Sequence, residues 1–298
     1  MLQGIFPVLP TCFSSEKALD PDAQQKVIQF ALEAGCHGLV FPGVASEYSF
    51  LTPDERGQLL DQLAGTVAGR VPIVGGASAG TVDEVVEAGT MATACGMNHL
   101  MIMAPGQFGE DARAHQQFFA QITAALPEAQ IILQNAPSPI GAGLGADAIL
   151  TLVNSNQSIT YIKEETLPSG PAISAFLDRK PSHLKGVFGG GGSRFIIDEL
   201  DRGACGAMPA VELTDLHVAL YQAHSQGNRS RARELYRLSL PLLVSQAIYR
   251  MGLTKYTLAR RGIADAQTLR AELPALDARA RRDIDEMLDE LLQSFPCP

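Results

Sequence analysis

The run Thr160-Tyr161-Ile162-Lys163-Glu164-Glu165-Thr166 is a β-prone segment that ends in charge, and seven similar runs occur elsewhere in the chain. Its β-branched and aromatic residues predict a short strand. The runs begin 22 to 33 residues apart, with longer amphipathic stretches between them. The eight runs are Ile5–Pro10, Gly38–Pro42, Val71–Gly75, His99–Ala104, Ile131–Gln134, Thr160–Lys163, Leu184–Phe188 and Gly206–Pro209. Eight strands that alternate with helices predict an α/β fold, a (β/α)8 TIM barrel.

Helix-start signals lie between the first strands. Asp20 is placed to cap a helix over Pro21–Gly35, in which apolar residues recur at helical spacing. Thr52 precedes a proline at the first helical position and a glutamate at the third, which is the pattern of a capping box.

The pattern changes after Pro209. From Leu213 to Ser294 the segments have helical periodicity, and Arg229–Tyr236 and Ala280–Leu292 are clearly amphipathic. We therefore expect a barrel over residues 1–212 and a C-terminal helical extension over residues 213–298.

Composition excludes several classes of function. The chain has 298 residues, 46% of them hydrophobic, which is enough for a large core. A net charge of −9 without a basic cluster argues against nucleic-acid and anionic-membrane partners. Met1–Pro7 does not resemble a signal peptide, and no apolar stretch is long enough to span a bilayer. The five scattered cysteines are typical of a reduced, cytoplasmic protein, and the six histidines lack the spacing of metal ligands.

Lys163 is the first candidate catalytic residue. Burying an ammonium is costly, so a buried strand favours the neutral amine, a nucleophile that forms Schiff bases with 2-oxo acids. Alternation along the strand places Glu165 on the same face and Glu164 on the other. Glu165 is then a candidate acid/base for the carbon next to the iminium. The alternatives are a lysine that snorkels to solvent and a glutamate that only pairs with it.

Other candidate residues follow the predicted strands, because the chemistry of such barrels gathers at the C-terminal strand ends. The second strand continues into Gly43–Tyr48 and the fifth ends in Gln134-Asn135-Ala136-Pro137. The seventh ends in four glycines, Gly189–Gly192, followed by Ser193 and a segment with helical character. Backbone N–H groups of such a run can hold a carboxylate or phosphate, although a purely conformational role is an equal alternative.

Motifs along almost the whole chain resemble the dihydrodipicolinate synthase / N-acetylneuraminate lyase family of class I Schiff-base lyases. Gly4–Thr11 is similar to the opening strand, and Gly43–Glu47 followed by Leu51–Arg56 is similar to the GxxGE…LTxxER block. Ile162-Lys163-Glu164 resembles the strand with the Schiff-base lysine, and Gly203–Ala207 the last barrel turn. The resemblance implies a homotetramer.

The chain departs from the family's pattern where that pattern has a hydroxyl relay. Gln134 occupies the position of a proton-shuttling tyrosine, and Val44 and Ala45 replace paired hydroxyl residues. The tyrosine pair after the fourth strand is replaced within Pro105–Phe108. A glutamine amide does not exchange a proton near neutral pH. The motifs Gln134–Pro137, Ser46-Glu47 and Lys163–Thr166 are closer to the 2-keto-3-deoxy-L-arabonate dehydratase branch.

These residues predict a dehydratase of a 2-keto-3-deoxy sugar acid, a small-molecule 2-oxo acid. Lys163, Glu165 and Gln134 are the expected catalytic residues. The expected substrate-binding residues are Ala45, Ser46, Gly189, Gly190 and Ser193. No cofactor or metal is expected, because the lysine iminium is itself the electron sink. Two alternatives remain open: a pyruvate-dependent aldolase or condensing enzyme of the same family, and a barrel that binds sugar acids without catalysis.

Overall fold

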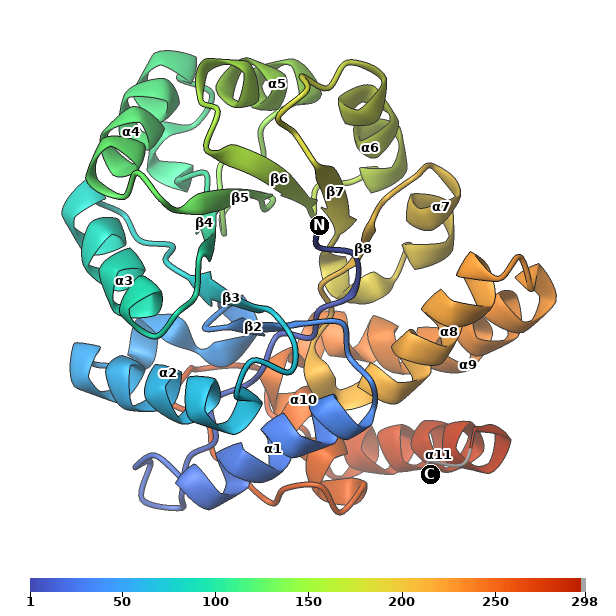
Figure 1. The fold of residues 1–298 in the computed structure, drawn as a ribbon. Coiled ribbons are helices and arrows are strands. Elements are labelled where there is room, and N and C mark those ends of the chain that lie inside the picture. Colours follow the sequence, from blue (N-terminus) through green and yellow to red (C-terminus); the bar gives the residue numbers. More distant parts are fainter. Residues whose placement is uncertain (296–298) are drawn as a thin grey trace.

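A computed structural model describes residues 1–295 and contains one eight-stranded parallel sheet curled into a barrel (Figure 1). The sheet order is β1-β8-β7-β6-β5-β4-β3-β2. Val8 closes the barrel, because it bridges to Val40 on one side and to Ala210 on the other. The strands are β1 (Gly4–Ile5), β2 (Leu39–Phe41), β3 (Ile73–Gly76), β4 (His99–Met103), β5 (Gln130–Asn135), β6 (Ile159–Glu164), β7 (Gly186–Gly189) and β8 (Gly206–Ala207). The predicted (β/α)8 barrel is confirmed.

Helices between the strands form the outer ring (Figure 1). They are α1 (Pro21–Glu33), α2 (Pro53–Val67), α3 (Val82–Ala94), α4 (Ala112–Ala125), α5 (Ala146–Ser155), α6 (Ser169–Asp178) and α7 (Ile196–Asp201). Asp20 caps α1 by accepting a hydrogen bond from the Ala23 N–H at 2.9 Å. Thr52 and Glu55 form the predicted capping box at the start of α2. The two helix starts predicted from the sequence, at Asp20 and Thr52, are therefore confirmed.

The hydrophobic core has an inner and an outer layer. Side chains that fill the barrel include Phe6, Val40, Ile132, Tyr161 and Phe188, all essentially buried. A larger cluster lies between the strands and helices α1–α6. The two layers hold the strand ends rigidly, and the site is built on those ends.

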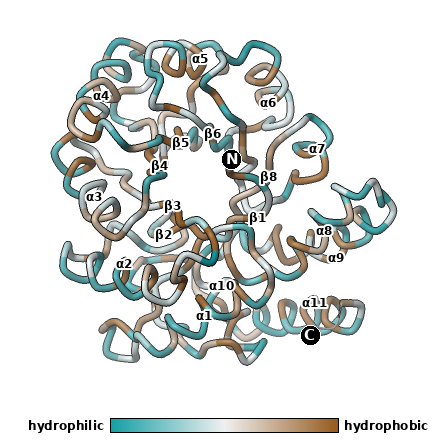
Figure 2. The backbone as a smooth tube through the Cα atoms, in the orientation of Figure 1, coloured by the Kyte–Doolittle hydropathy of each residue, from teal (hydrophilic) through white to brown (hydrophobic). Residues whose placement is uncertain are grey.

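Four further helices follow the barrel strands: α8 (Thr214–Ser225), α9 (Arg229–Tyr249), α10 (Met251–Arg260) and α11 (Ala278–Ser294). α8 packs against β1, and α9 packs against α8, α10 and α11. Along α11, hydrophobic and hydrophilic residues alternate (Figure 2), and Ile284, Leu288 and Leu291 are buried. Their cluster includes Ile5 of β1, so these helices share a core with the barrel.

Three segments differ from the sequence-based expectation. The first ladder is shorter than Ile5–Pro10, because Pro7 and Pro10 lack the N–H that a ladder needs. The segment after the glycine run becomes helical only at Ile196, since Ser193 has a left-handed φ of 64°. Residues 262–277 are not helical, although helical periodicity suggested helix up to Ser294. Instead, their backbone N–H groups bind a carboxylate of the barrel.

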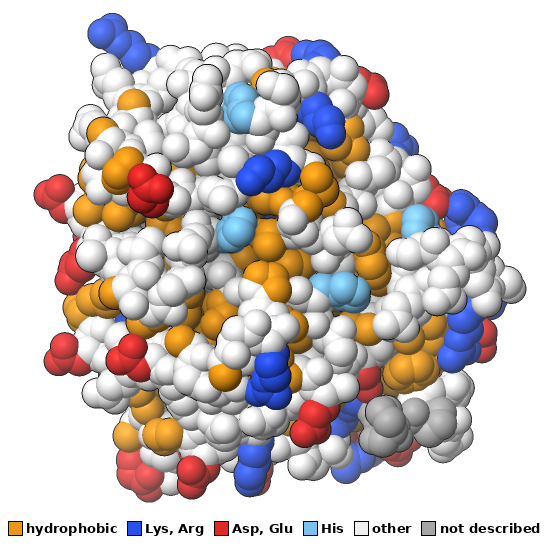
Figure 3. Space-filling view, in the orientation of Figure 1, with side chains coloured by type: hydrophobic (Ala, Val, Ile, Leu, Met, Phe, Trp, Pro, Cys, Tyr) orange, Lys and Arg blue, Asp and Glu red, His pale blue; other side chains and the backbone are white. Residues whose placement is uncertain are grey.

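The surface carries charges of both signs. On the face seen in Figure 3, acidic and basic side chains intermingle around the rim, while hydrophobic ones gather nearer the centre. Within residues 1–295, no helix combines the length and apolar character that crossing a membrane requires. Cys12, Cys36, Cys95 and Cys205 are free thiols, and Cys297 lies outside the described residues.

Candidate active site

A cavity of about 170 Å³ lies at the C-terminal ends of the strands. Lys163, near the end of β6, lines it and is only 4% exposed. Gln134 of β5 lies beside Lys163 in the strand register and lines the same cavity. The other lining residues are Val8, Val44, Ala45, Ala136, Pro137, Ile140, Glu165, Gly191, Gly192, Arg194, Met208, Ala210, Gln246, Ala247, Arg250 and Met251.

Glu165 is held by three donors. Its Oε1 lies 3.1 Å from Lys163 Nζ and accepts a hydrogen bond from Gln134 Nε2 at 2.5 Å. Its Oε2 accepts from the Gly191 N–H at 3.4 Å. Burial acts to raise the pKa of Glu165, but the charge of Lys163 and these hydrogen bonds outweigh it, so the pKa lies below its usual value. The resting group is therefore a carboxylate beside the lysine amine, suited to accept a proton.

Glu164 points to the other side of β6, as alternation requires. Its Oε2 accepts from Asn135 Nδ2 at 2.9 Å, and its Oε1 accepts from the Thr166 N–H at 2.6 Å. Burial raises its pKa. Glu164 does not line the cavity, and its contacts fasten the end of β6 to β5.

The glycine run gives Glu165 its space. A Cβ on Gly190 would lie 2.2 Å from Glu165 Cγ, and one on Gly189 would lie 1.9 Å from Glu199 Oε2. Gly189, Gly190 and Ser193 are not among the lining residues, whereas Gly191 and Gly192 are. Among the described residues the buried Ser193 hydroxyl has no hydrogen-bond partner. Any side chain at Gly190 would displace the Glu165 carboxylate, so the absence of a side chain at this position is a structural requirement of the site.

The turn after β2 forms another wall. Val44 and Ala45 line the cavity as part of a 3₁₀ turn over Val44–Ser46. The Ser46 hydroxyl is fully buried, donates to the Leu9 carbonyl and accepts from the Gly43 N–H at 2.8 Å. This hydroxyl therefore holds the turn together and does not line the cavity.

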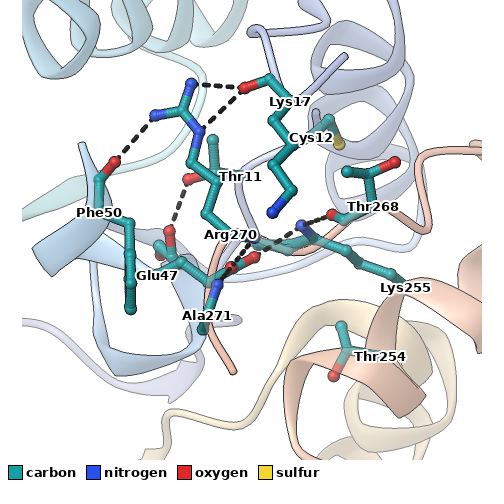
Figure 4. A network of polar contacts seen from close by, with 12 residues as sticks. Thr11, Cys12, Lys17, Glu47, Phe50, Thr254, Lys255, Thr268, Arg270 and Ala271 are labelled. Carbon is teal, nitrogen blue, oxygen red and sulfur yellow. Dashed lines mark hydrogen bonds and ion pairs between the residues drawn. The ribbon is translucent and has the colours of Figure 1, made fainter. Parts of the chain in front are cut away.

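An ion-pair network behind that turn joins it to the C-terminal helices (Figure 4). Lys255 Nζ of α10 lies 2.7 Å from Glu47 Oε1, and both side chains are essentially buried. Glu47 Oε2 accepts from the N–H groups of Arg270 and Ala271, each at 2.8 Å. Lys255 also donates to the Thr268 carbonyl at 2.7 Å. Glu47, which directly follows the Val44–Ser46 turn, is thus held in place by residues of the C-terminal extension.

Lys255 is a second buried lysine, and its surroundings differ from those of Lys163. Burial lowers the pKa of Lys255 while Glu47 opposes that shift. Its Nζ lies 4.6 Å from the centre of the Phe13 ring, and the side chain does not line the cavity. Lys163 is the one lysine among the cavity-lining residues of the described chain.

Sequence reasoning missed part of the site. Arg194, Gln246, Arg250 and Met251 line the cavity, and the last three come from α9, the α9–α10 junction and α10. Nothing in their local sequence marks them, because their role depends on how the extension packs over the barrel. The one available signal was the position of Arg194, two residues after the last glycine of the run.

Comparison with known proteins identifies the family of the chain. Residues 1–291 match the dihydrodipicolinate synthetase family. An uncharacterised DapA-like lyase from Halobacterium salinarum is 28% identical over 296 residues, covering 97% of this chain and 94% of that protein. An L-2-keto-3-deoxyarabonate dehydratase from Azospirillum brasilense is 26% identical over 287 residues, covering 95% and 92%. Dihydrodipicolinate synthase from Rhodopseudomonas palustris has the same fold, with a TM-score of 0.90 at 23% identity and 97% coverage of both chains. The chain is a class I lyase of the dihydrodipicolinate synthetase family.

Proposed function

We propose that the protein dehydrates a 2-keto-3-deoxy sugar acid through a Schiff base on Lys163. The observation that carries this proposal is the hydrogen bond from Gln134 to Glu165 beside Lys163. An amide stands where an aldolase-type proton shuttle needs a phenol, and no tyrosine is among the cavity-lining residues of the described chain. A single carboxylate is then available to move protons at the carbon next to the iminium.

The reaction begins when Glu165 takes a proton from Lys163 and the neutral amine attacks the C2 ketone. Glu165 then returns the proton to the carbinolamine hydroxyl, which leaves as water and gives the iminium. The iminium acidifies the C3 protons, and Glu165 removes one of them to give the enamine. The enamine electrons then expel the C4 hydroxyl, which takes a proton from Glu165 and leaves as water. Hydrolysis of the unsaturated iminium releases the dehydrated 2-oxo acid and restores Lys163.

The turn at Val44–Ala45 and Gln134, which line the cavity, bind the substrate in this proposal. The C1 carboxylate lies on backbone N–H groups of the turn at Ala45, whose shape the Ser46 hydroxyl maintains. Gln134 orients substrate hydroxyls and Glu165 without exchanging protons. The similarity to the A. brasilense dehydratase supports the substrate class, with 2-keto-3-deoxy-L-arabonate as one candidate.

The competing reaction is retro-aldol cleavage with release of pyruvate. It needs a base for the C4 hydroxyl, and in this cavity that base would again be Glu165 or water. Mass analysis of products from a panel of 2-keto-3-deoxy acids decides between the two reactions. We expect products lighter than substrate by one water. Stoichiometric pyruvate would instead identify an aldolase, and no turnover of any keto acid would identify a binding barrel.

We also propose a homotetramer, on the basis of family membership and the apolar content of the chain. Light scattering at micromolar concentration should give four times the mass of the 31.7 kDa chain. A monomer mass would refute this assembly.

A further inference from the structure

Two arginines from different parts of the fold line the cavity that contains Lys163. Arg194 follows the glycine run, and Arg250 lies between α9 and α10. Within residues 1–295, no salt bridge of 4.0 Å or less involves either of them. Arg194 Nη1 donates one long hydrogen bond of 3.5 Å to the Leu243 carbonyl. Most of the donor capacity of the two guanidinium groups is thus free for a ligand.

The charges around the cavity do not balance. Lys163, Arg194 and Arg250 are cationic, and Glu165 is the one carboxylate among the lining residues. The two arginines are close enough to influence each other: burial lowers the pKa of Arg194, the charge of Glu165 opposes that shift, and the charge of Arg250 adds to it. In a chain of net charge −9, two cations held together at a cavity indicate an anionic ligand. One substrate carboxylate would leave a positive charge uncompensated, because the iminium keeps the charge of Lys163.

Local geometry keeps the arginine side of the cavity open. Gly192 has a φ of 69°, and a Cβ there would lie 3.2 Å from Arg194 Nη1 and 3.2 Å from Gln246 Oε1. Arg250 has a φ of 49°, a left-handed conformation that is unfavourable for a residue with a side chain. Strained residues of this kind concentrate at binding sites, where the surrounding structure holds them.

We propose that Arg194 and Arg250 bind a second carboxylate at the far end of the substrate. This deepens, and rests on, the proposed dehydratase function. The preferred substrate is then a 2-oxo-3-deoxy diacid with a C4 hydroxyl, and an acid that ends in an uncharged CH₂OH group is a poorer one. A carboxylate suits the planar fork of a guanidinium group. Ala45, Lys163 and the two arginines line the same cavity, so a substrate with C1 on the turn and C2 on Lys163 has its remaining carboxylate within the same enclosure as the guanidinium groups.

The test compares probes that form the Schiff base and lack a leaving hydroxyl. 2-Oxoglutarate is paired with 2-oxopentanoate, and 2-oxoadipate with 2-oxohexanoate, so each pair differs by a terminal carboxylate. Borohydride trapping and intact mass give the half-saturating concentration for each probe. We expect at least one diacid to half-saturate at a concentration about 10- to 100-fold lower than its partner, the usual value of a charge-assisted contact.

Substitution of the two arginines tests whether they cause the preference for diacids over monoacids. Arg194→Met and Arg250→Met should each remove most of it and leave trapping of pyruvate, which has no tail, within about 3-fold of wild type. Arg250→Lys keeps the charge and should retain part of the preference. Arg237→Met, at an exposed position of α9, is the matched control and should behave as wild type.

The outcomes separate this inference from the proposed function. If the diacid and the monoacid of each pair half-saturate at the same concentration while Lys163 is still trapped, the inference is wrong and the proposed function is unaffected. An equal loss for pyruvate and the diacids in the Met variants also overturns it, because the arginines would then bind the C1 carboxylate. No adduct on Lys163 with any probe overturns the proposed function and the inference together.

Discussion

Gln134 and Lys163 lie side by side in the register of β5 and β6, and both approach the same carboxylate oxygen, Glu165 Oε1. Gln134 Nε2 lies 2.5 Å from this oxygen and Lys163 Nζ lies 3.1 Å from it. An acceptor shared in this way couples the position of the carboxylate to that of the lysine.

Lys163 should be the site of the Schiff base, because it is the lysine that lines the cavity. Borohydride reduction in the presence of pyruvate should add one adduct per chain at Lys163, located by peptide mass mapping. Lys163→Ala should abolish the adduct. An adduct on the buried Lys255 or on the exposed Lys185 would show that the site assignment is wrong.

Glu165→Gln keeps the shape of the side chain and removes its titrating group. The variant should form the Schiff base nearly as well as wild type and lose about 10²–10⁴-fold in kcat, the usual contribution of general acid–base catalysis. Single-turnover trapping and steady-state rates measure the two effects separately. Gln134→Tyr is the companion variant, and it should release at most traces of pyruvate. A wild-type rate in Glu165→Gln would reduce Glu165 to a partner of the lysine.

The acid limb of the pH–rate profile should report Glu165. Its pKa lies below the usual 4.5, so kcat/KM in wild type should persist below that pH and fall only when the carboxylate takes up a proton. Gln134→Leu removes one hydrogen bond that lowers this pKa, so its acid limb should move to higher pH. Profiles of both enzymes on one substrate measure the shift. An unmoved limb would mean that another group controls it.

The Glu47–Lys255 pair should be costly to break from one side. Lys255→Met leaves Glu47 buried without its cation, and we expect a loss of about 3–5 kcal/mol in the free energy of unfolding. Glu47→Gln combined with Lys255→Met should lose less than the sum of the single changes, since neither charge is then left alone. Urea unfolding of wild type, the two single variants and the double variant measures the coupling free energy of the pair, and Lys185→Met, at an exposed position, is the control. Additive losses would show that the pair is not coupled.

Glu199 should make stability depend on pH. Burial raises the pKa of Glu199 from 4.5 to about 7, while Ser169 opposes the shift by donating a hydrogen bond of 2.7 Å. The folded state binds the proton more tightly than the unfolded chain, so this group makes stability fall as the pH rises from about 4.5 to about 7.

Glu199→Gln isolates that contribution. The variant should match wild type near pH 4, below the unfolded pKa, and exceed it near pH 8 by on the order of 1–3 kcal/mol in urea unfolding. The buried Glu212, whose pKa burial also raises to about 7, is present in both proteins and cancels. A difference that is the same at both pH values would contradict a titrating Glu199.

Local and periodic features were predictable from the sequence. Strand runs, the Asp20 and Thr52 caps, and the shared face of Lys163 and Glu165 depend on neighbours a few residues away. Gln134 and Glu165 were both expected at the C-terminal strand ends, but the hydrogen bond between them was not predicted.

Features that depend on the packing of distant segments were not predictable. Arg250 reaches the cavity because α9 and α10 pack over the barrel mouth, which no local pattern encodes. The Ser46 hydroxyl was expected to face the substrate, but it binds the Leu9 carbonyl, 37 residues away. Residues 262–277 have helical periodicity, yet Glu47 binds the backbone N–H groups of Arg270 and Ala271 in that segment.

The Glu47 network also has a consequence for biosynthesis. A ribosome makes Glu47, directly after the turn at Val44–Ser46, 208 residues before Lys255 and 224 residues before Ala271. Until they emerge, Glu47 lacks the groups that compensate its charge, and a nascent barrel has no reason to bury it. The wall of the cavity therefore forms only after Lys255 and Ala271 have left the ribosome. A polypeptide stalled before residue 255 would have the strands and the lysine but no finished pocket.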